Sequence, residues 1–117
     1  MAEDWSRPVV HWELVAKDAG KMAAFYGELF NWEVGEGRVR NIGPGIGAPE
    51  NITGHIREGS DPGVVLYIQV LKLAETMEKA KRLGGKVVRE PFDPAAGGPT
   101  LAWIEDPEGN RVVLVQQ

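Results

Sequence analysis

The chain has 117 residues, of which 43% are hydrophobic and 26% charged, an ordinary composition for one globular domain. It has no cysteine, which excludes disulfides and thiolate chemistry, and its 13 scattered Lys and Arg residues against 17 Asp and Glu argue against nucleic acid as a partner. No apolar run approaches the roughly 18 residues of a membrane span, and the acidic start lacks the features of a signal peptide, so we expect no membrane partner and a cytoplasmic location.

The first predicted element is a β-strand over residues 9–16, because polar and apolar side chains alternate there. Side chains two residues apart on a strand point the same way, so His11 and Glu13 project together. Trp12 and Leu14 form the opposite face, which is apolar enough to pack against a helix. An imidazole and a carboxylate therefore share a face that can line a cavity.

A helix is expected from residue 19 to about residue 30. Asp18 is a good N-cap because its carboxylate can accept hydrogen bonds from exposed backbone N–H groups, and Asn31 is a plausible stop. Residues at helical spacing give this helix an apolar stripe: Met22, Phe25, Tyr26 and Leu29.

Short strands are predicted next at 32–34 and 38–42, followed by a loop at 43–50 that is rich in Gly and Pro. This loop lacks the motif and context of a phosphate-binding loop, so we interpret it as a mobile loop or cavity lid. A further strand is expected over 51–57. There Thr53 and His55 share one face, with Ile52, Gly54 and Ile56 on the other.

The second half of the sequence repeats this organisation. A turn at 60–63 precedes a strand over 64–70, and a helix marked by Leu73, Met77, Ala80 and Leu83 ends at Gly84. Lys72 is a poor residue to begin that helix. The remaining predicted elements are a strand at 86–90, a loop at 92–99, and a hairpin of strands 101–105 and 111–115 around a structural turn at 106–110.

Sliding the sequence by 54 residues places His11 on Val65 and Glu13 on Tyr67, with the order of elements preserved. The chain therefore reads as a duplicated β-α-β-β-β unit, with modules at about 9–57 and 64–116 in a single domain. We predict an α+β fold in which the two modules form curved mixed sheets around a concave cavity, with the helices outside.

Several motifs in this order resemble the vicinal oxygen chelate superfamily, the group of glyoxalase I, bleomycin-resistance proteins and extradiol dioxygenases. The motifs are His11-x-Glu13, Ala23-Ala24-Phe25-Tyr26, Leu29-Phe30-x-Trp32, Leu83-Gly84-Gly85-Lys86-Val87 and Glu105-Asp106-Pro107-Glu108-Gly109-Asn110. The resemblance covers about residues 9–116. It implies the fold directly, whereas one fold serves many chemistries in this group.

In metal-dependent members of that superfamily, four inward positions hold the ion. His11 matches the first position, but the fifth-strand and eighth-strand positions fall on Val65 and Val113, which cannot ligate. The fourth-strand position falls on His55, or on Gly54 if the register slips by one residue. The resemblance therefore implies a degenerate metal site and puts glyoxalase I activity in doubt.

The first function that we expect is binding of a small organic molecule, with or without metal-independent proton transfer by His11 and Glu13. Glu13 is expected to raise the pKa of His11. We expect no cofactor. The residues expected to contact the ligand are His55, Val65, Tyr67, Gln69, Trp103 and Val113.

Two other functions stay open at this point. One is a metal-dependent lyase, isomerase or dioxygenase relative that binds Zn²⁺, Ni²⁺, Mn²⁺ or Fe²⁺ through His11, Glu13 and His55. The other is a non-catalytic subunit or regulatory module. In each case we expect a homodimer.

Overall fold

A computed structural model describes residues 6–43 and 52–117 of the chain. The predicted loop at 43–50 falls almost entirely outside the described residues. Within the described part there are two helices and seven strands: β1 (Val9–Ala16), α1 (Ala19–Phe30), β2 (Val39–Asn41), β3 (Thr53–Glu58), β4 (Gly63–Gln69), α2 (Leu73–Arg82), β5 (Lys86–Phe92), β6 (Thr100–Glu105) and β7 (Arg111–Gln116). Neither described helix has the length and apolar character needed to cross a membrane.

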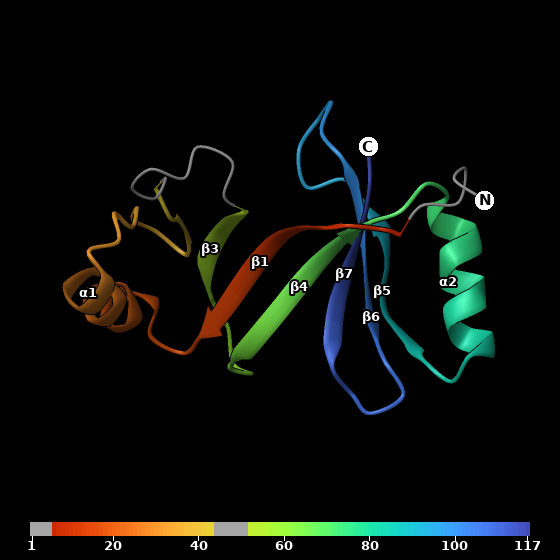
Figure 1. Ribbon diagram of the computed structural model, residues 1–117, viewed down its shortest axis with the longest axis horizontal. Helices are drawn as coiled ribbons and strands as arrows, with labels where there is room; N and C mark the ends of the chain where they lie inside the picture. The colour runs from red at the N-terminus through yellow and green to blue at the C-terminus, as the bar shows by residue number, and fades with distance from the viewer. Residues whose placement is uncertain (1–5, 44–51) are drawn as a thin grey trace. The chain divides into compact units, whose positions relative to one another are not determined.

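The chain divides into two compact units (Figure 1). The N-terminal unit is His11–Val65, and its strands are ordered β2-β3-β1. The C-terminal unit is Leu66–Gln117 with Met1–Val10, and its strands are ordered β4-β7-β6-β5. Both units combine a helix with a mixed sheet, which confirms the predicted α+β class.

Helix α1 begins and ends as the sequence predicts. The Asp18 carboxylate accepts a hydrogen bond from the Lys21 backbone N–H at 3.0 Å, and Asn31 ends the helix in the left-handed conformation with φ 61°. The helix packs on a core of Ala16, Ala19 and Ile56, together with Leu14, Met22, Ala23, Tyr26, Val34 and Ile42.

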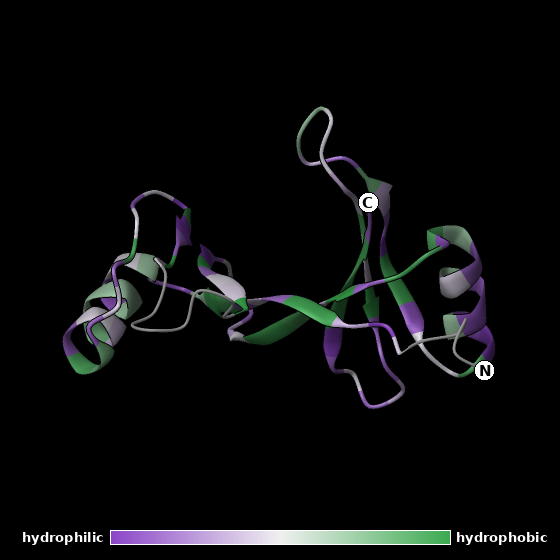
Figure 2. Ribbon diagram, turned by 45° about the horizontal axis from the view of Figure 1, so that its top comes forward, coloured by the Kyte–Doolittle hydropathy of each residue, from purple (hydrophilic) through white to green (hydrophobic). Residues whose placement is uncertain are grey.

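Only part of the predicted apolar stripe of α1 is buried. Met22 and Tyr26 pack on the core, but Phe25 and Leu29 are 53% and 58% exposed. The apolar side chains of α1 extend beyond the side that packs on the core, since Phe30 is also exposed, and Figure 2 shows apolar and polar colours mixed along the helix. One narrow sheet covers only one side of such a helix.

Two predicted strands of this unit are shorter than expected. The segment 32–34 is not a strand: only Val34 forms an isolated bridge, with Ile42. The predicted strand 38–42 is reduced to Val39–Asn41. Among its described residues, the N-terminal unit therefore has two strands and one bridge after its helix, not three strands. The surrounding glycines and the rings of Trp32 and Tyr26, stacked at 5.1 Å, favour side-chain packing over a longer ladder.

Strands β1 and β3 are parallel neighbours, with Leu14 opposite Ile56, Glu13 opposite His55, and Trp12 opposite Gly54. Ile56 and Leu14 face α1, so Glu13 and His55 occupy the face away from the helix. Gly54 is needed at its position, because a Cβ atom there would overlap the indole ring of Trp12.

In the C-terminal unit, β4 is parallel to β7, which forms an antiparallel pair with β6. The predicted turn at 106–110 joins β6 to β7. The Asp106 carboxylate accepts hydrogen bonds from the backbone N–H groups of Glu108 and Asn110, both at 2.9 Å, so this segment is a structural hairpin turn. Helix α2 covers one sheet face through Val70, Leu73, Met77, Ala102 and Leu114.

Helix α2 starts at Leu73, as expected, although Lys72 provides no side-chain cap. The cap comes instead from β7: the side-chain oxygen of Gln116 accepts a hydrogen bond from the Leu73 N–H at 2.6 Å. Gly84 takes the predicted left-handed conformation, with φ 98°. Leu83, predicted on the apolar face, is 66% exposed because the helix ends at Arg82 and the backbone turns away.

Strand β5 is longer than predicted and ends at Phe92, which was expected to begin the loop. Its pairing with β6 reaches Phe92, opposite Leu101. Pro91 is tolerated because β5 is the outer strand of its unit, where an N–H group is not required on the open side.

We predict that Gln116→Ala lowers the free energy of unfolding by about 1 kcal/mol, the usual cost of losing a helix cap. Urea denaturation measures this change. Gln117→Ala is the matched control, because Gln117 lies one residue further on and is exposed. Equal stability of the two variants would mean that the Gln116 contact does not cap α2.

We predict that Gly54→Ala destabilises the N-terminal unit by about 2 kcal/mol, because the added methyl group displaces the Trp12 ring. Replacing Trp12 with Leu in the same chain should recover part of this loss. Gly35→Ala is the control, since a Cβ there meets nothing closer than 3.7 Å. Thermal unfolding of the four proteins tests this, and an unchanged Gly54→Ala variant would contradict it.

Candidate functional site

The candidate site lies on the face of β1 and β3 that points away from α1. The parallel register places His11 opposite Thr53, Glu13 opposite His55, and Val15 opposite Arg57. Because paired residues of neighbouring strands point to the same face, the polar side chains of both strands meet in two adjacent columns. The structure thus brings together His11, Glu13 and His55, all within the N-terminal unit.

Four side-chain contacts connect these residues in a row. His11 Nδ1 lies 2.6 Å from Thr53 Oγ1, and His11 Nε2 lies 2.6 Å from His55 Nδ1. His55 Nε2 lies 2.9 Å from Glu13 Oε1. The other carboxylate oxygen, Oε2, accepts from Arg57 Nε at 3.0 Å and lies 2.9 Å from a second nitrogen of that guanidinium.

Burial increases along this row. Thr53 is exposed, His11 is half-buried, and His55 and Glu13 are only 8% and 2% exposed. A carboxylate this deeply buried requires compensation of its charge, and the Arg57 guanidinium supplies it. The row therefore runs from the surface at Thr53 to a neutralised ion pair in the interior.

With both imidazoles neutral, one arrangement of protons satisfies these contacts together. Arg57 donates to the Glu13 carboxylate, which has only acceptor atoms, so His55 Nε2–H must donate to it as well. A neutral His55 then accepts at Nδ1, which requires a proton on His11 Nε2. His11 Nδ1 is left as an acceptor, facing the Thr53 hydroxyl.

The pKa of His11 is lowered from its ordinary value of 6.5, in contrast to the predicted rise. Burial is the main cause, since it disfavours the charged imidazolium, and the neighbouring His55 ring acts in the same direction. Glu13 does raise the pKa of His11, as expected, but this effect is smaller. The carboxylate is hydrogen-bonded to His55 and Arg57, and its Coulomb effect on His11 is the smallest of the three causes.

The donor atoms do not converge as a metal site requires. His11 Nε2 and His55 Nδ1 face each other, and His55 Nε2 faces Glu13. In the described ranges 6–43 and 52–117, no group of three His, Asp or Glu side chains is placed to hold a metal ion. Metal binding by His11, Glu13 and His55 would require these contacts to break first.

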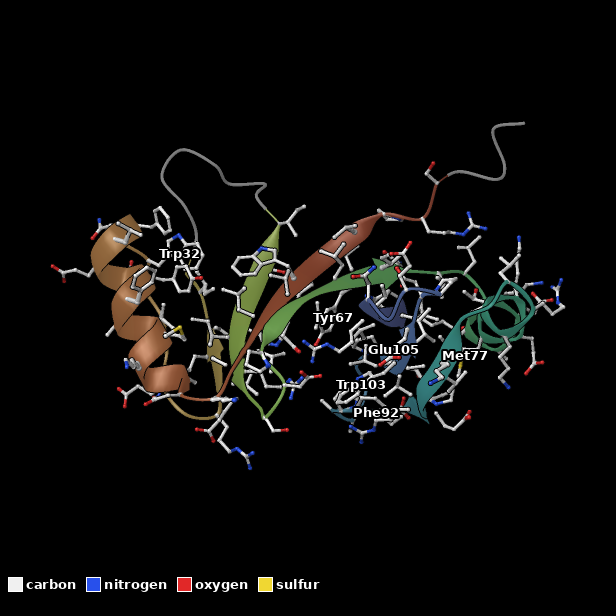
Figure 3. The ribbon with its side chains drawn as sticks, turned by 90° about the horizontal axis from the view of Figure 1, so that it is seen from below. Trp32, Tyr67, Met77, Phe92, Trp103 and Glu105 are labelled. Carbon is white, nitrogen blue, oxygen red and sulfur yellow. The ribbon has the colours of Figure 1, made fainter. Side chains whose placement is uncertain are left out.

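The other predicted ligand residues lie in the C-terminal unit or at its border. Tyr67 of β4 is opposite Val113 of β7, which is opposite Trp103 of β6, so the three form a row across the sheet. Gln69, opposite Val115, belongs to the next row on the same face. This face points away from α2, and in Figure 3 Trp103 and Tyr67 lie on the other side of the strands from Met77.

Val65 precedes Tyr67 by two residues on β4 and is 3% exposed, and Val113 is 4% exposed. Both are therefore buried aliphatic residues, one in each unit. Neither carries an atom that could bind a metal.

Two residues of the site were not recognised from sequence as functional. The alternation along 51–57 predicts the correct face for Thr53 but no role for it, and Arg57 stands only as the last residue of the predicted strand. The period of two along β3 could have identified Arg57, because it follows His55 by two residues and must share its face. The buried carboxylate of Glu13, on the neighbouring strand, would then have required such a cation.

The family model described as a glyoxalase-like domain matches residues 9–115, nearly the whole chain. The chain belongs to this family. The match also confirms the resemblance to the vicinal oxygen chelate superfamily, which was inferred from the motifs in both halves of the sequence.

Curated relatives match about half of the chain. A probable lactoylglutathione lyase of Synechocystis is 44% identical over 51 residues, which are 44% of this chain and 39% of that protein. Lactoylglutathione lyase of Escherichia coli O157:H7 is 38% identical over 53 residues, or 44% of this chain and 38% of that protein. The chain thus matches well under two thirds of the length of these relatives.

Solved structures show the same fold at low identity. A glyoxalase/bleomycin resistance protein/dioxygenase superfamily member from Vibrio splendidus is 13% identical, with a TM-score of 0.67 over 96% of this chain and 100% of that one. The Mn(II)-bound glyoxalase from Novosphingobium aromaticivorans is 20% identical, with a TM-score of 0.67 over 96% of this chain and 40% of that one.

The lowered pKa of His11 predicts that the folded protein loses stability as the pH falls below 6.5. The unfolded chain, with the ordinary pKa, then binds a proton that the folded chain binds only at lower pH, so protonation favours unfolding. His11→Gln should remove this part of the pH dependence. Urea denaturation of both proteins at about pH 7.5, 6.5 and 5.5 measures it. Parallel curves for the two proteins would contradict the prediction.

Proposed function

We propose that this protein binds a small organic molecule beside His11 and uses His11 as a base, without requiring a metal ion. The observation that supports the proposal is the row of contacts from Thr53 through His11 and His55 to Glu13 and Arg57. It resembles the general arrangement in which a buried carboxylate orients one imidazole so that the reactive nitrogen is a fixed acceptor.

His11 has the properties of a base near neutral pH. Its pKa is lowered, so the ring is neutral there and Nδ1 carries a lone pair. That nitrogen faces Thr53, the exposed end of the row, so a ligand can approach it from the surface. A proton taken up at Nδ1 leaves the Nε2–H bond to His55 in place.

Glu13, His55 and Arg57 are positioning residues in this proposal. Glu13 fixes the proton of His55 on Nε2, and His55 in turn fixes the proton of His11 on its own Nε2. Arg57 pairs with the carboxylate, which compensates its charge and keeps its oxygens in place as acceptors. The charge that forms on His11 is then balanced through one intervening ring.

The kind of reaction that suits a single neutral base is transfer of a proton at a carbon next to a carbonyl group. Lactoylglutathione is a reasonable first test compound, because the curated relatives are named lactoylglutathione lyases. Methylmalonyl-CoA is a second one, since an epimerase for it from Mycobacterium tuberculosis shares the fold. Both are starting points for a screen of carbonyl compounds.

Incubation of such compounds with the protein in deuterated water tests the proposal, with deuterium incorporation read by mass spectrometry. We predict exchange that persists with a chelator and falls at least about a hundredfold in His11→Gln, the usual contribution of a general base. Elemental mass spectrometry of the same samples reports bound metal. Exchange that disappears with the chelator, or that survives in His11→Gln, would contradict the proposal.

Glu13→Gln distinguishes a positioning role from a purely structural one. The amide can donate as well as accept, so it no longer fixes the proton of His55, and the pH profile of exchange should change along with its rate. Glu33→Gln is the matched control because Glu33 is an exposed carboxylate outside the site. Comparison of the urea unfolding midpoints of the variants with that of the wild-type protein shows how much of any loss of exchange activity is caused by unfolding.

A further inference from the structure

The second feature of interest lies in the C-terminal unit, on its outer strand β5. Arg89 of β5 is opposite Trp103 of β6, but the pairing shifts on both sides of Arg89, first after Val87 and again before Phe92. The neighbouring β6–β7 pairing is regular over all of its six residue pairs. Irregularities of this kind redirect a side chain at the expense of ladder hydrogen bonds, and they are frequent beside functional sites.

The redirected side chain lies on two aromatic rings. The guanidinium carbon of Arg89 is 3.5 Å from the centre of the Phe92 ring and 5.2 Å from that of Trp103. The two rings are 6.0 Å apart and nearly perpendicular, at 77°. A separation of 3.5 Å is that of stacked planar groups, so the cation is held flat on Phe92.

When the Arg89 guanidinium stacks on a ring, its N–H groups point outward in its own plane. The ring faces therefore do not take up these hydrogen-bond donors. Within the part of the chain that the structure describes, Arg89 forms no ion pair with a carboxylate. A guanidinium held in this way presents two parallel N–H donors, which match two oxygens of an acidic group. Because the side chain is already ordered, binding such a group costs little further entropy.

An apolar surface continues from the cation along the sheet. The row that contains Arg89 and Trp103 goes on through Val113 to Tyr67, on the face away from α2. Three strand spacings separate its ends, about 14 Å in all, which is the length of a molecule with two or three rings. Figure 3 shows Tyr67, Phe92 and Trp103 on this side of the strands.

We propose that the cluster of Arg89, Phe92 and Trp103 is a binding site for planar aromatic molecules that carry an acidic group. Arg89 donates paired hydrogen bonds to the carboxylate or sulfonate, and the ring system lies along Trp103 toward Tyr67. The proposal concerns the C-terminal unit alone and does not depend on the base assigned to His11, so either proposal can fail while the other stands.

Two fluorescent probes distinguish the contribution of the acidic group to binding from that of the aromatic rings. 8-Anilino-1-naphthalenesulfonate carries a sulfonate, and N-phenyl-1-naphthylamine has the same rings without it. Titration of each into the full chain gives its Kd. We expect Arg89→Gln to weaken binding of the sulfonate about tenfold or more, and binding of the neutral amine by less than about twofold.

Arg82→Gln is the matched control, since it removes the same charge from an exposed position on α2. Retained binding of the neutral probe shows that the face is intact in Arg89→Gln. In the wild-type protein, the Nε–H resonance of Arg89 should move in NMR spectra with the sulfonate but not with the amine.

Three outcomes would overturn the proposal. They are unchanged affinity of Arg89→Gln for the sulfonate, equal loss of both probes, and no response of the Arg89 resonance. Arg89→Lys should bind the sulfonate less tightly than wild type, because an ammonium group neither stacks flat nor offers two parallel donors.

Discussion

The N-terminal unit depends on the charge of one buried carboxylate. Glu13 is 2% exposed, and an ionised group at that depth is stable only with a partner of opposite charge and with its oxygens hydrogen-bonded. Arg57 meets the first requirement, and Arg57 and His55 together meet the second. With both imidazoles neutral, the order of donors and acceptors on the two rings follows from this one carboxylate, because it accepts but cannot donate.

This constraint explains why the two histidines are hydrogen-bonded to each other and to Glu13 and do not form a ready set of metal ligands. Metal ligands direct their lone pairs to a common point, whereas here each ring nitrogen is directed to the next side chain. In the C-terminal unit the corresponding strands carry Tyr67 opposite Val113, which leaves an apolar and aromatic surface. Two units of related topology therefore support different kinds of interaction.

Local sequence determined much of the secondary structure. Alternation on β1 placed His11 and Glu13 on one face, Asp18 and Asn31 marked the ends of α1, and the turn after Asp106 was identified as structural. These features depend on neighbouring residues, so they can be read without knowledge of the fold. The motifs in both halves also identified the superfamily. The prediction of a strand at 32–34 was wrong, since only Val34 pairs there, in an isolated bridge with Ile42.

The sequence alone determined which face of each strand is polar and which family the chain belongs to, since both are recorded in residue order. Only the tertiary structure decided that His55, and not Gly54, lies opposite Glu13, because register depends on the pairing of two strands separated by about forty residues. It also decided the direction of the His11 pKa shift and the cap of α2 by Gln116. Burial and contacts between distant residues set both, and no local pattern encodes them.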